Sequence, residues 1–211
     1  LNTHLGCYGD GIVRTPNIDK LAQRGVRFER AYAQYPVCNP SRTSFLSGLH
    51  PETTGVMDQQ TLLKNTMPNV VYLPEHFSAN GYFTAAIGKV EHGAHHDAHW
   101  DVAEELKGGE EDEVVTERRG GKKKGGPQTP RKRETRLPYL EERATTDERD
   151  PENVDTRIAE RAVKLLEEKR EKPFFIAIGF HKPHVPHVAP KRFFDLYPRE
   201  KMALVKVPAD D

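Results

Sequence analysis

The sequence predicts an α/β fold in which a mostly parallel, or mixed, sheet is flanked by helices. Two short apolar runs, 82–90 and 173–180, are rich in aromatic and β-branched residues, as is typical of fully buried parallel strands. Between and before these runs lie segments with helical periodicity, of which 155–169 is the clearest. Helices that alternate with buried strands indicate an α/β domain, and 211 residues suffice for one domain or a large part of one.

Each element has its own local signal. Thr15 and Pro16 form a helix-start pair, and Gly25 ends the helix that they begin. In chain order, helices are expected over residues 15–24, 40–49, 73–81 and 155–169, and strands over residues 26–33, 82–90 and 173–180.

Composition excludes several classes of protein. The 32 basic residues balance the 32 acidic ones, which argues against general nucleic-acid binding, because phosphate contacts need a surplus of Lys and Arg. No apolar run approaches the roughly 20 residues of a membrane span. Cys7 and Cys38 can form at most one bridge, so the chain is no disulfide framework.

The segment 101–150 differs from the rest of the chain. It is dominated by charged residues and glycines, cannot bury a core, and is expected to be a flexible surface insertion. Its basic block, Lys122–Lys124 and Arg131–Arg133, could bind a polyanion. The flanking acidic residues favour a solvated loop instead.

Seven of the ten histidines lie in two windows, 88–101 and 179–187, each directly after an expected buried strand. Ligands of open α/β sheets bind at the carboxyl ends of the strands. We therefore expect that edge of the sheet to collect cations and imidazoles beside the turn that holds Cys38, which suggests an anionic substrate. The residues concerned are Lys89, His92, His181 and Lys182.

Zinc binding is a rival interpretation of the first window. Histidines three and four apart on a helix can share a zinc ion, and the candidates are His92, His95, His96 and His99. Gly93 and the lack of a clear helical pattern make this interpretation weaker.

Cys38 lies in the stretch PVCNPSRTSFLSG, residues 36–48. A lone cysteine is usually a small buried hydrophobic residue. Here, however, the ordered run of Cys38, Pro40, Ser41, Arg42, Leu46, Ser47 and Gly48 resembles the signature of type I sulfatases. In that family a separate maturation enzyme reads this motif and oxidises the cysteine to formylglycine.

The resemblance covers most of the chain. Residues 15–34 are similar to the segment upstream of the sulfatase nucleophile, and 81–90 to the strand that delivers the active-site lysine. Two residues separate Lys89 from His92, which is similar to the iduronate-2-sulfatase branch. The resemblance implies that residues 1–211 are the N-terminal portion of an alkaline-phosphatase-like sulfatase core, with 101–150 unmatched.

The resemblance also implies a mechanism and a role for each residue. One hydroxyl of hydrated formylglycine attacks the sulfur of a sulfate ester, and loss of a proton from the other expels sulfate. Cys38 becomes the nucleophile, Arg42 steadies it, His92 acts as base and His181 protonates the leaving oxygen. Lys89, Lys182 and His184 bind the substrate, which is expected to be the sulfate ester of a saccharide.

Calcium is the metal that the family implies. The family binds it through two adjacent aspartates that would precede Leu1 and through a pair far downstream, so that Cys38, as formylglycine, is the one ligand in this chain. This implies a fragment, expected to be inactive in isolation. Sulfatases of this type are often exported, which favours an exported parent protein.

Two alternatives stay open. A phosphonate or phosphate monoester hydrolase of the same superfamily can use the same modified cysteine. A non-catalytic relative that binds sulfated polysaccharides would retain the motif only as a relic. The presence of all five candidate residues counts against the second alternative: Cys38, Arg42, Lys89, His92 and His181.

Overall fold

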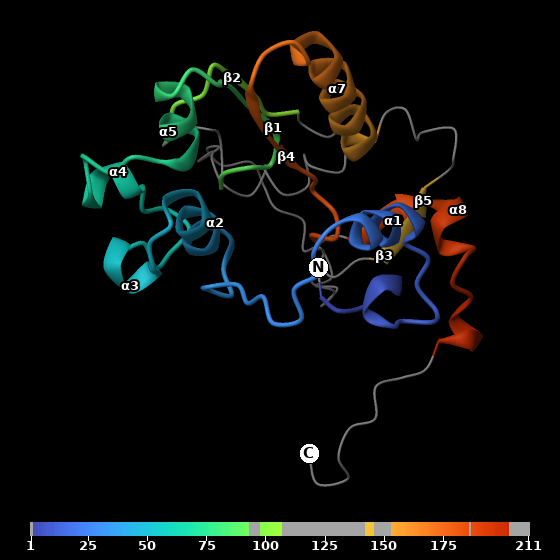
Figure 1. Cartoon of the computed structure of the whole chain (residues 1–211). Coiled ribbons are helices and arrows are strands. Elements are labelled where there is room, and N and C mark those ends of the chain that lie inside the picture. The colour runs from blue at the N-terminus through green and yellow to red at the C-terminus, as the bar shows by residue number, and fades with distance from the viewer. Residues whose placement is uncertain (1, 93–97, 107–141, 146–152, 186, 203–211) are drawn as a thin grey trace, which may run out of the picture. The chain divides into compact units, whose positions relative to one another are not determined.

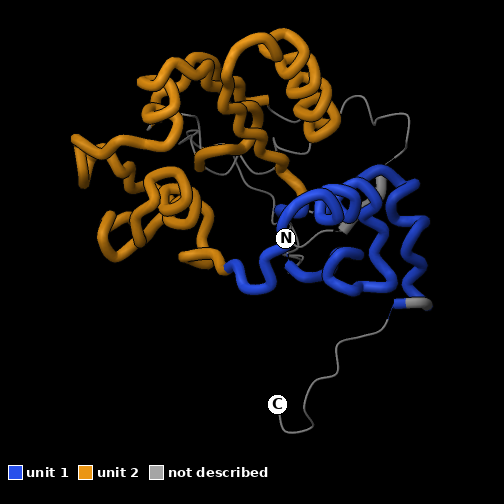
Figure 2. The backbone as a smooth tube through the Cα atoms, viewed as in Figure 1, with its two compact units in different colours: residues 1–31, 136–149, 183–211 blue, residues 32–135, 150–182 orange. Residues whose placement is uncertain are grey.

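A computed structural model of the chain describes residues 2–92, 98–106, 142–145, 153–185 and 187–202 (Figure 1). The chain divides into two compact units (Figure 2). Unit 1 consists of residues 1–31, 136–149 and 183–211, and unit 2 of residues 32–135 and 150–182.

Unit 2 contains a three-stranded parallel sheet. The strands are β1 (Phe83–Gly88), β2 (Val102–Glu104) and β4 (Phe174–Gly179), and their order is β2-β1-β4. β1 is paired with both of the others. Two of the three strands that the sequence predicted, β1 and β4, are thus direct neighbours in one sheet, as an α/β fold requires.

Helices cover both faces of this sheet. α7 (Val154–Lys169) lies on one side of β1 and β4, and α5 (Leu73–Ala79) lies on the other (Figure 1). On the α7 side, Ile87 packs in a cluster with Ile158 and Leu165. On the opposite side, Ala86 belongs to a second cluster that includes Tyr72 and Trp100. The alternation of neighbouring β1 residues between two cores explains why this strand is an unbroken apolar run.

Helix α2 (Cys38–Ser47) begins two residues earlier than expected and ends at Gly48, whose φ is 72°. Pro40 occupies its first turn, where an amide has no partner within the helix, so the missing N–H costs no hydrogen bond there. Two short helices follow, α3 (Pro51–Thr54) and α4 (Leu63–Thr66).

β4 is less buried than the sequence predicted. Phe174 is 37% exposed and Ile178 is 41% exposed, whereas five of the six β1 residues are buried. The physical reason is position, because β1 lies between two strands and β4 lies at the edge of the described sheet. The expectation of full burial was therefore right for β1 and wrong for β4.

Unit 1 contains η1 (Gly6–Tyr8), α1 (Pro16–Arg24), α8 (Lys191–Phe194) and η4 (Arg199–Lys201). Its two strands, β3 (Glu142–Thr145) and β5 (His187–Pro190), are parallel partners. α1 confirms the expected first helix. The strand expected over 26–33 is wrong: Val26 is 80% exposed and Phe28 69% exposed, and β-forming composition makes no strand without a partner.

The charged segment 101–150 contains two strands, β2 near its beginning and β3 near its end. Glu104 at the end of β2 accepts two hydrogen bonds from Arg161 Nε, at 2.8 and 3.0 Å, and one from Nη2 at 2.7 Å, which ties β2 to α7. The basic block, Lys122–Lys124 and Arg131–Arg133, lies outside the described residues.

Two further findings concern the cysteines and the possibility of a membrane span. Both cysteines, Cys7 and Cys38, are free thiols. Among the described helices, none has the length and apolar character needed to cross a membrane.

Candidate active site

The carboxyl ends of β1 and β4 meet at a pair of glycines. Gly88 and Gly179 are register partners, and the Lys89 amide donates to the Gly179 carbonyl at 2.7 Å. A Cβ atom on Gly179 would lie 2.0 Å from the Lys89 carbonyl oxygen, so only glycine permits this approach. The two histidine windows therefore begin side by side, as the sequence predicted.

Arg42 connects helix α2 to the turn that follows β1. Its Nη1 donates to the carbonyl oxygens of Lys89, at 2.5 Å, and Val90, at 2.9 Å. Burial lowers the pKa of the Arg42 guanidinium, and the charge of a Cys38 thiolate opposes that shift. Arginine stays protonated all the same, so Arg42 is a fixed positive charge one helical turn from Cys38.

Cys38 is the first residue of α2 and is partly exposed. The N-terminal end of a helix carries a partial positive charge, which favours an anion near this position. One amide of the first turn is already engaged, because Asn39 N donates to Gln59 Oε1 at 2.9 Å. Pro40 has no N–H, and the Ser41 amide donates to the Val37 carbonyl at 3.1 Å. The electrostatic contribution of the helix at this position therefore comes from its dipole.

Asn39 anchors the beginning of α2 to the loop 58–61. Its buried side-chain amide donates to the carbonyl oxygens of Asp58 and Thr61, both at 2.8 Å. The sequence motif leaves this position unassigned, and no local pattern reveals its role, because both acceptors lie about 20 residues away.

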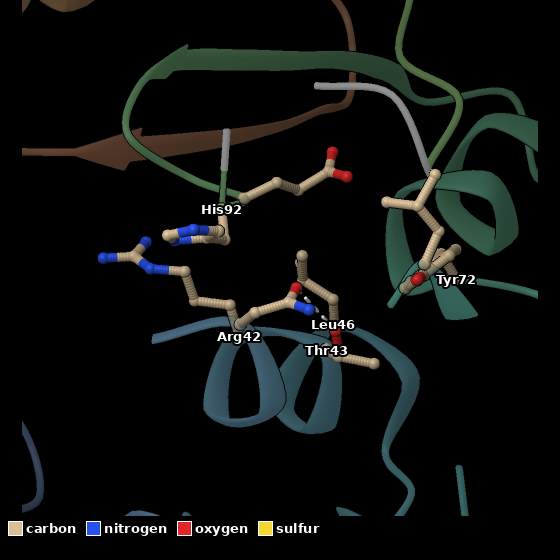
Figure 3. Close-up of a pocket in the computed structure, with 8 residues that line it drawn as sticks. Arg42, Thr43, Leu46, Tyr72 and His92 are labelled. Atoms are coloured by element: carbon tan, nitrogen blue, oxygen red, sulfur yellow. Dashed lines mark hydrogen bonds between the residues drawn. The ribbon is translucent and has the colours of Figure 1, made fainter. Parts of the chain in front are cut away.

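A small cavity lies between α2 and the segment after β1. Figure 3 shows the His92 ring beside the side chain of Arg42 at this cavity. Cys38, Lys89 and His181 are not among its walls. The lining residues are Asn39, Arg42, Thr43, Leu46, Leu62, Tyr72, Glu91 and His92.

Glu91 is a second residue that the sequence did not single out. Its buried carboxylate accepts from Trp100 Nε1 at 2.9 Å and from Ala98 N at 3.3 Å. These bonds close the loop of the first histidine window and fix the backbone next to His92.

Asp155 holds the second window. This residue follows the first residue of α7, and its carboxylate accepts from the backbone amides of His181, at 2.7 Å, and Lys182, at 2.9 Å. The turn after β4 is thereby fixed to the beginning of α7.

The candidate residues fall into two groups. Unit 2 contains Cys38, Arg42, Lys89, His92, His181 and Lys182, on α2 and on the segments that follow β1 and β4. His184 belongs to unit 1, where its exposed ring has Nδ1 2.7 Å from the Val185 carbonyl oxygen. Its predicted role in substrate binding stays a prediction.

Among the described residues, no group of three or more His, Cys, Asp or Glu side chains could hold a metal ion. His95 and His96, two of the four zinc candidates, lie outside the described residues. Since a calcium ion takes six to eight oxygen ligands, the described part of the chain does not fit a calcium site by itself.

Solved structures share this fold. A 2-O GAG sulfatase matches 85% of this chain and 32% of its own, with a TM-score of 0.55 and 25% identity. The phosphonate monoester hydrolase of Agrobacterium radiobacter matches 95% of this chain and 42% of its own, with a TM-score of 0.64. At 18% identity the latter likeness shows the fold alone. The expected α/β, alkaline-phosphatase-like core is confirmed.

Sequence comparison gives the family. Iduronate 2-sulfatase from Homo sapiens is 37% identical over 217 residues, which cover 99% of this chain and 38% of that protein. This chain thus spans well under half the length of that relative. A family model described as Sulfatase matches residues 2–206. The chain belongs to the sulfatase family.

Proposed function

We propose that the protein containing this chain hydrolyses sulfate esters, and that Cys38 is the precursor of its nucleophile. The observation that carries the proposal is the placement of Cys38 at the beginning of α2. Arg42, one turn away, is fixed by hydrogen bonds to the backbone at the end of β1. A nucleophile beside a fixed cation and a helix N-terminus suits attack on a group that carries negative charge.

The modified residue explains why a cysteine stands here. Sulfatases generally depend on formylglycine, whose hydrate supplies one hydroxyl for attack on sulfur and a second whose deprotonation releases sulfate. Cys38 is a free and partly exposed thiol, so its Cβ is open to oxidation by a separate maturation enzyme.

Each remaining residue has a role that its position supports. Lys89 and Arg42 neutralise the sulfate oxygens, since both lie where α2 meets the end of β1. His92, beside Arg42, takes the proton from the second hydroxyl. His181, after β4, gives a proton to the leaving oxygen, and Lys182 assists in binding the substrate. For His184, in the other unit, the substrate-binding role rests on the sequence alone.

A sulfated saccharide is the substrate class that we propose. The human relative is named iduronate 2-sulfatase, and one solved neighbour is a 2-O GAG sulfatase. Sulfatases of this family generally also use Ca²⁺. The described residues do not form a cation site, so we assign none of these steps to the ion. We further propose that the protein is exported.

The mass of the tryptic peptide Ala31–Arg42, which contains Cys38, tests the proposal. After expression with a maturation enzyme, we expect the CH₂SH group of Cys38 to be replaced by an aldehyde. Cys7 is the internal control and should stay a thiol. An unmodified Cys38 in protein that still cleaves a sulfate ester would contradict the proposal, and so would a preference for phosphate or phosphonate esters over sulfate esters.

A further inference from the structure

Asp155 makes an unusual pair of contacts near the end of β4. Oδ1 accepts from the His181 amide at 2.7 Å, and Oδ2 accepts from the Lys182 amide at 2.9 Å. Both oxygens of one carboxylate thus serve two successive backbone amides. Hydrogen bonds to a charged acceptor are about twice as strong as those between neutral groups.

The carboxylate is itself held in place. The Asp155 amide donates to the side chain of Asn153, the residue that caps α7, at 2.9 Å. α7 in turn packs against β1 and β4 through Ile158 and Leu165, which are almost fully buried. The position of Asp155 is therefore fixed by the helix cap and by the packing of α7.

The segment that Asp155 holds carries two of the proposed functional residues. His181 follows Gly179 by two residues, and the Gly179 carbonyl accepts a hydrogen bond from the Lys89 amide. Contacts at Gly179 and Asp155 fix this short stretch from both sides. The backbone conformation of a residue sets the direction of its Cα–Cβ bond. By fixing the backbone of His181, the Asp155 carboxylate therefore also sets the direction in which the His181 side chain leaves the backbone.

We propose that Asp155 is a positioning residue for sulfate-ester cleavage, which places the imidazole of His181 through the His181 and Lys182 amides. This inference rests on the proposed function. In this role the carboxylate acts on the two backbone amides and not on the reacting atoms. Its contribution is geometric, and displacement of a catalytic group by about 1 Å can cost about 100-fold in rate.

Leaving-group chemistry separates a positioning role from a general loss of structure. A proton donor matters most when the leaving alcohol is weakly acidic, as in a sugar sulfate. It matters little for para-nitrophenyl sulfate, whose phenol leaves readily without a proton. Misplacement of His181 should therefore slow the first ester more than the second, whereas a loss of folded enzyme should slow both equally.

The test measures kcat/KM of the matured full-length protein and its Asp155→Ala and Asp155→Asn variants on a sulfated monosaccharide and on para-nitrophenyl sulfate. For Asp155→Ala we expect a fall of about 10- to 100-fold on the sugar ester and a markedly smaller fall on the aryl ester. Asp155→Asn keeps one oxygen acceptor and should recover part of the difference.

Glu104→Gln is the matched control, because it weakens another contact of α7, the ion pair with Arg161. It should leave the ratio of the two kcat/KM values unchanged. Equal losses on both esters in Asp155→Ala, or no loss, would overturn the inference.

Hydrogen exchange distinguishes this inference from the proposed function. Exchange of the His181 and Lys182 amides should accelerate in Asp155→Ala and not in Glu104→Gln. Unchanged exchange would show that Asp155 does not hold the segment. A wild-type protein that cleaves neither ester would contradict the proposed function, and the proposed positioning role of Asp155 in catalysis would be contradicted with it.

Discussion

At the scale of single residues, Asn39 anchors the beginning of the helix that carries Cys38. Three hydrogen bonds join its backbone and side-chain amides to Gln59, Asp58 and Thr61. The Asn39 side chain is buried, so no water can replace a lost hydrogen-bond partner of its amide. Asn39 therefore supports the geometry of the site although it lies outside the matched motif.

Replacement of this residue tests that role. Asn39→Ala removes two side-chain hydrogen bonds, each contributing about 0.5–1.5 kcal/mol, and should lower the free energy of unfolding by about 1–3 kcal/mol. Chemical denaturation measures the change. Asn80→Ala is the control, because the exposed Asn80 side chain donates to a single carbonyl, that of His76, and should change stability by less than about 0.5 kcal/mol. Equal effects of the two substitutions would argue against an anchoring role for Asn39.

At the scale of elements, the junction of β1 and β4 brings the two histidine windows together. Parallel pairing aligns Gly88 with Gly179, and the Lys89 backbone then passes directly over Gly179. Because residue 179 has no side chain, the Lys89 amide can approach the Gly179 carbonyl to which it donates.

Gly179→Ala should disrupt this junction. The new methyl group would meet backbone atoms of Lys89 at 2.0–2.2 Å, which only a backbone shift can relieve. We expect a loss of about 1–3 kcal/mol in stability, as is typical of overpacked cores, together with loss of turnover because Lys89 moves. Thermal unfolding and kcat/KM measure the two effects. Gly11→Ala, where no atom lies within 4 Å, should be neutral, and wild-type behaviour of Gly179→Ala would refute the steric argument.

At the scale of the whole molecule, the chain contains the proposed nucleophile precursor, Cys38, and the cation Arg42 beside it, whereas its described residues form no cation site. The chain spans 38% of the human relative, and we expect residues elsewhere in the full-length protein to contribute to a calcium site.

A calcium titration of the 211-residue chain tests this view. We expect isothermal titration calorimetry to detect no binding at micromolar calcium, because no cluster of three or more acidic, His or Cys side chains exists in the described part of the chain. A longer protein that includes the rest of the catalytic domain should bind under the same conditions. Tight binding by the 211-residue chain would contradict the expectation.

Local patterns in the sequence by themselves determined most of the architecture. The positions of α1, α5, α7, β1 and β4 follow from periodicity and punctuation by Pro and Gly, which act over a few residues. Cys38 and Arg42 were also found from the sequence, because their relation is one helical turn and needs no distant partner. Only tertiary structure decided that residues 26–33 form no strand and that β4 is an edge, because pairing and burial depend on neighbours remote in the chain.

The residues that support the site were likewise revealed only by the tertiary structure. Asn39, Glu91 and Asp155 act through acceptors and donors in other segments, and for Asn39 and Asp155 these partners lie about 20 residues or more away. A polar residue in a sequence gives no sign of which distant amide or carbonyl it meets. The sequence therefore predicted which groups perform the chemistry, and the fold decided which groups hold them, because chemistry depends on residue type and positioning depends on packing.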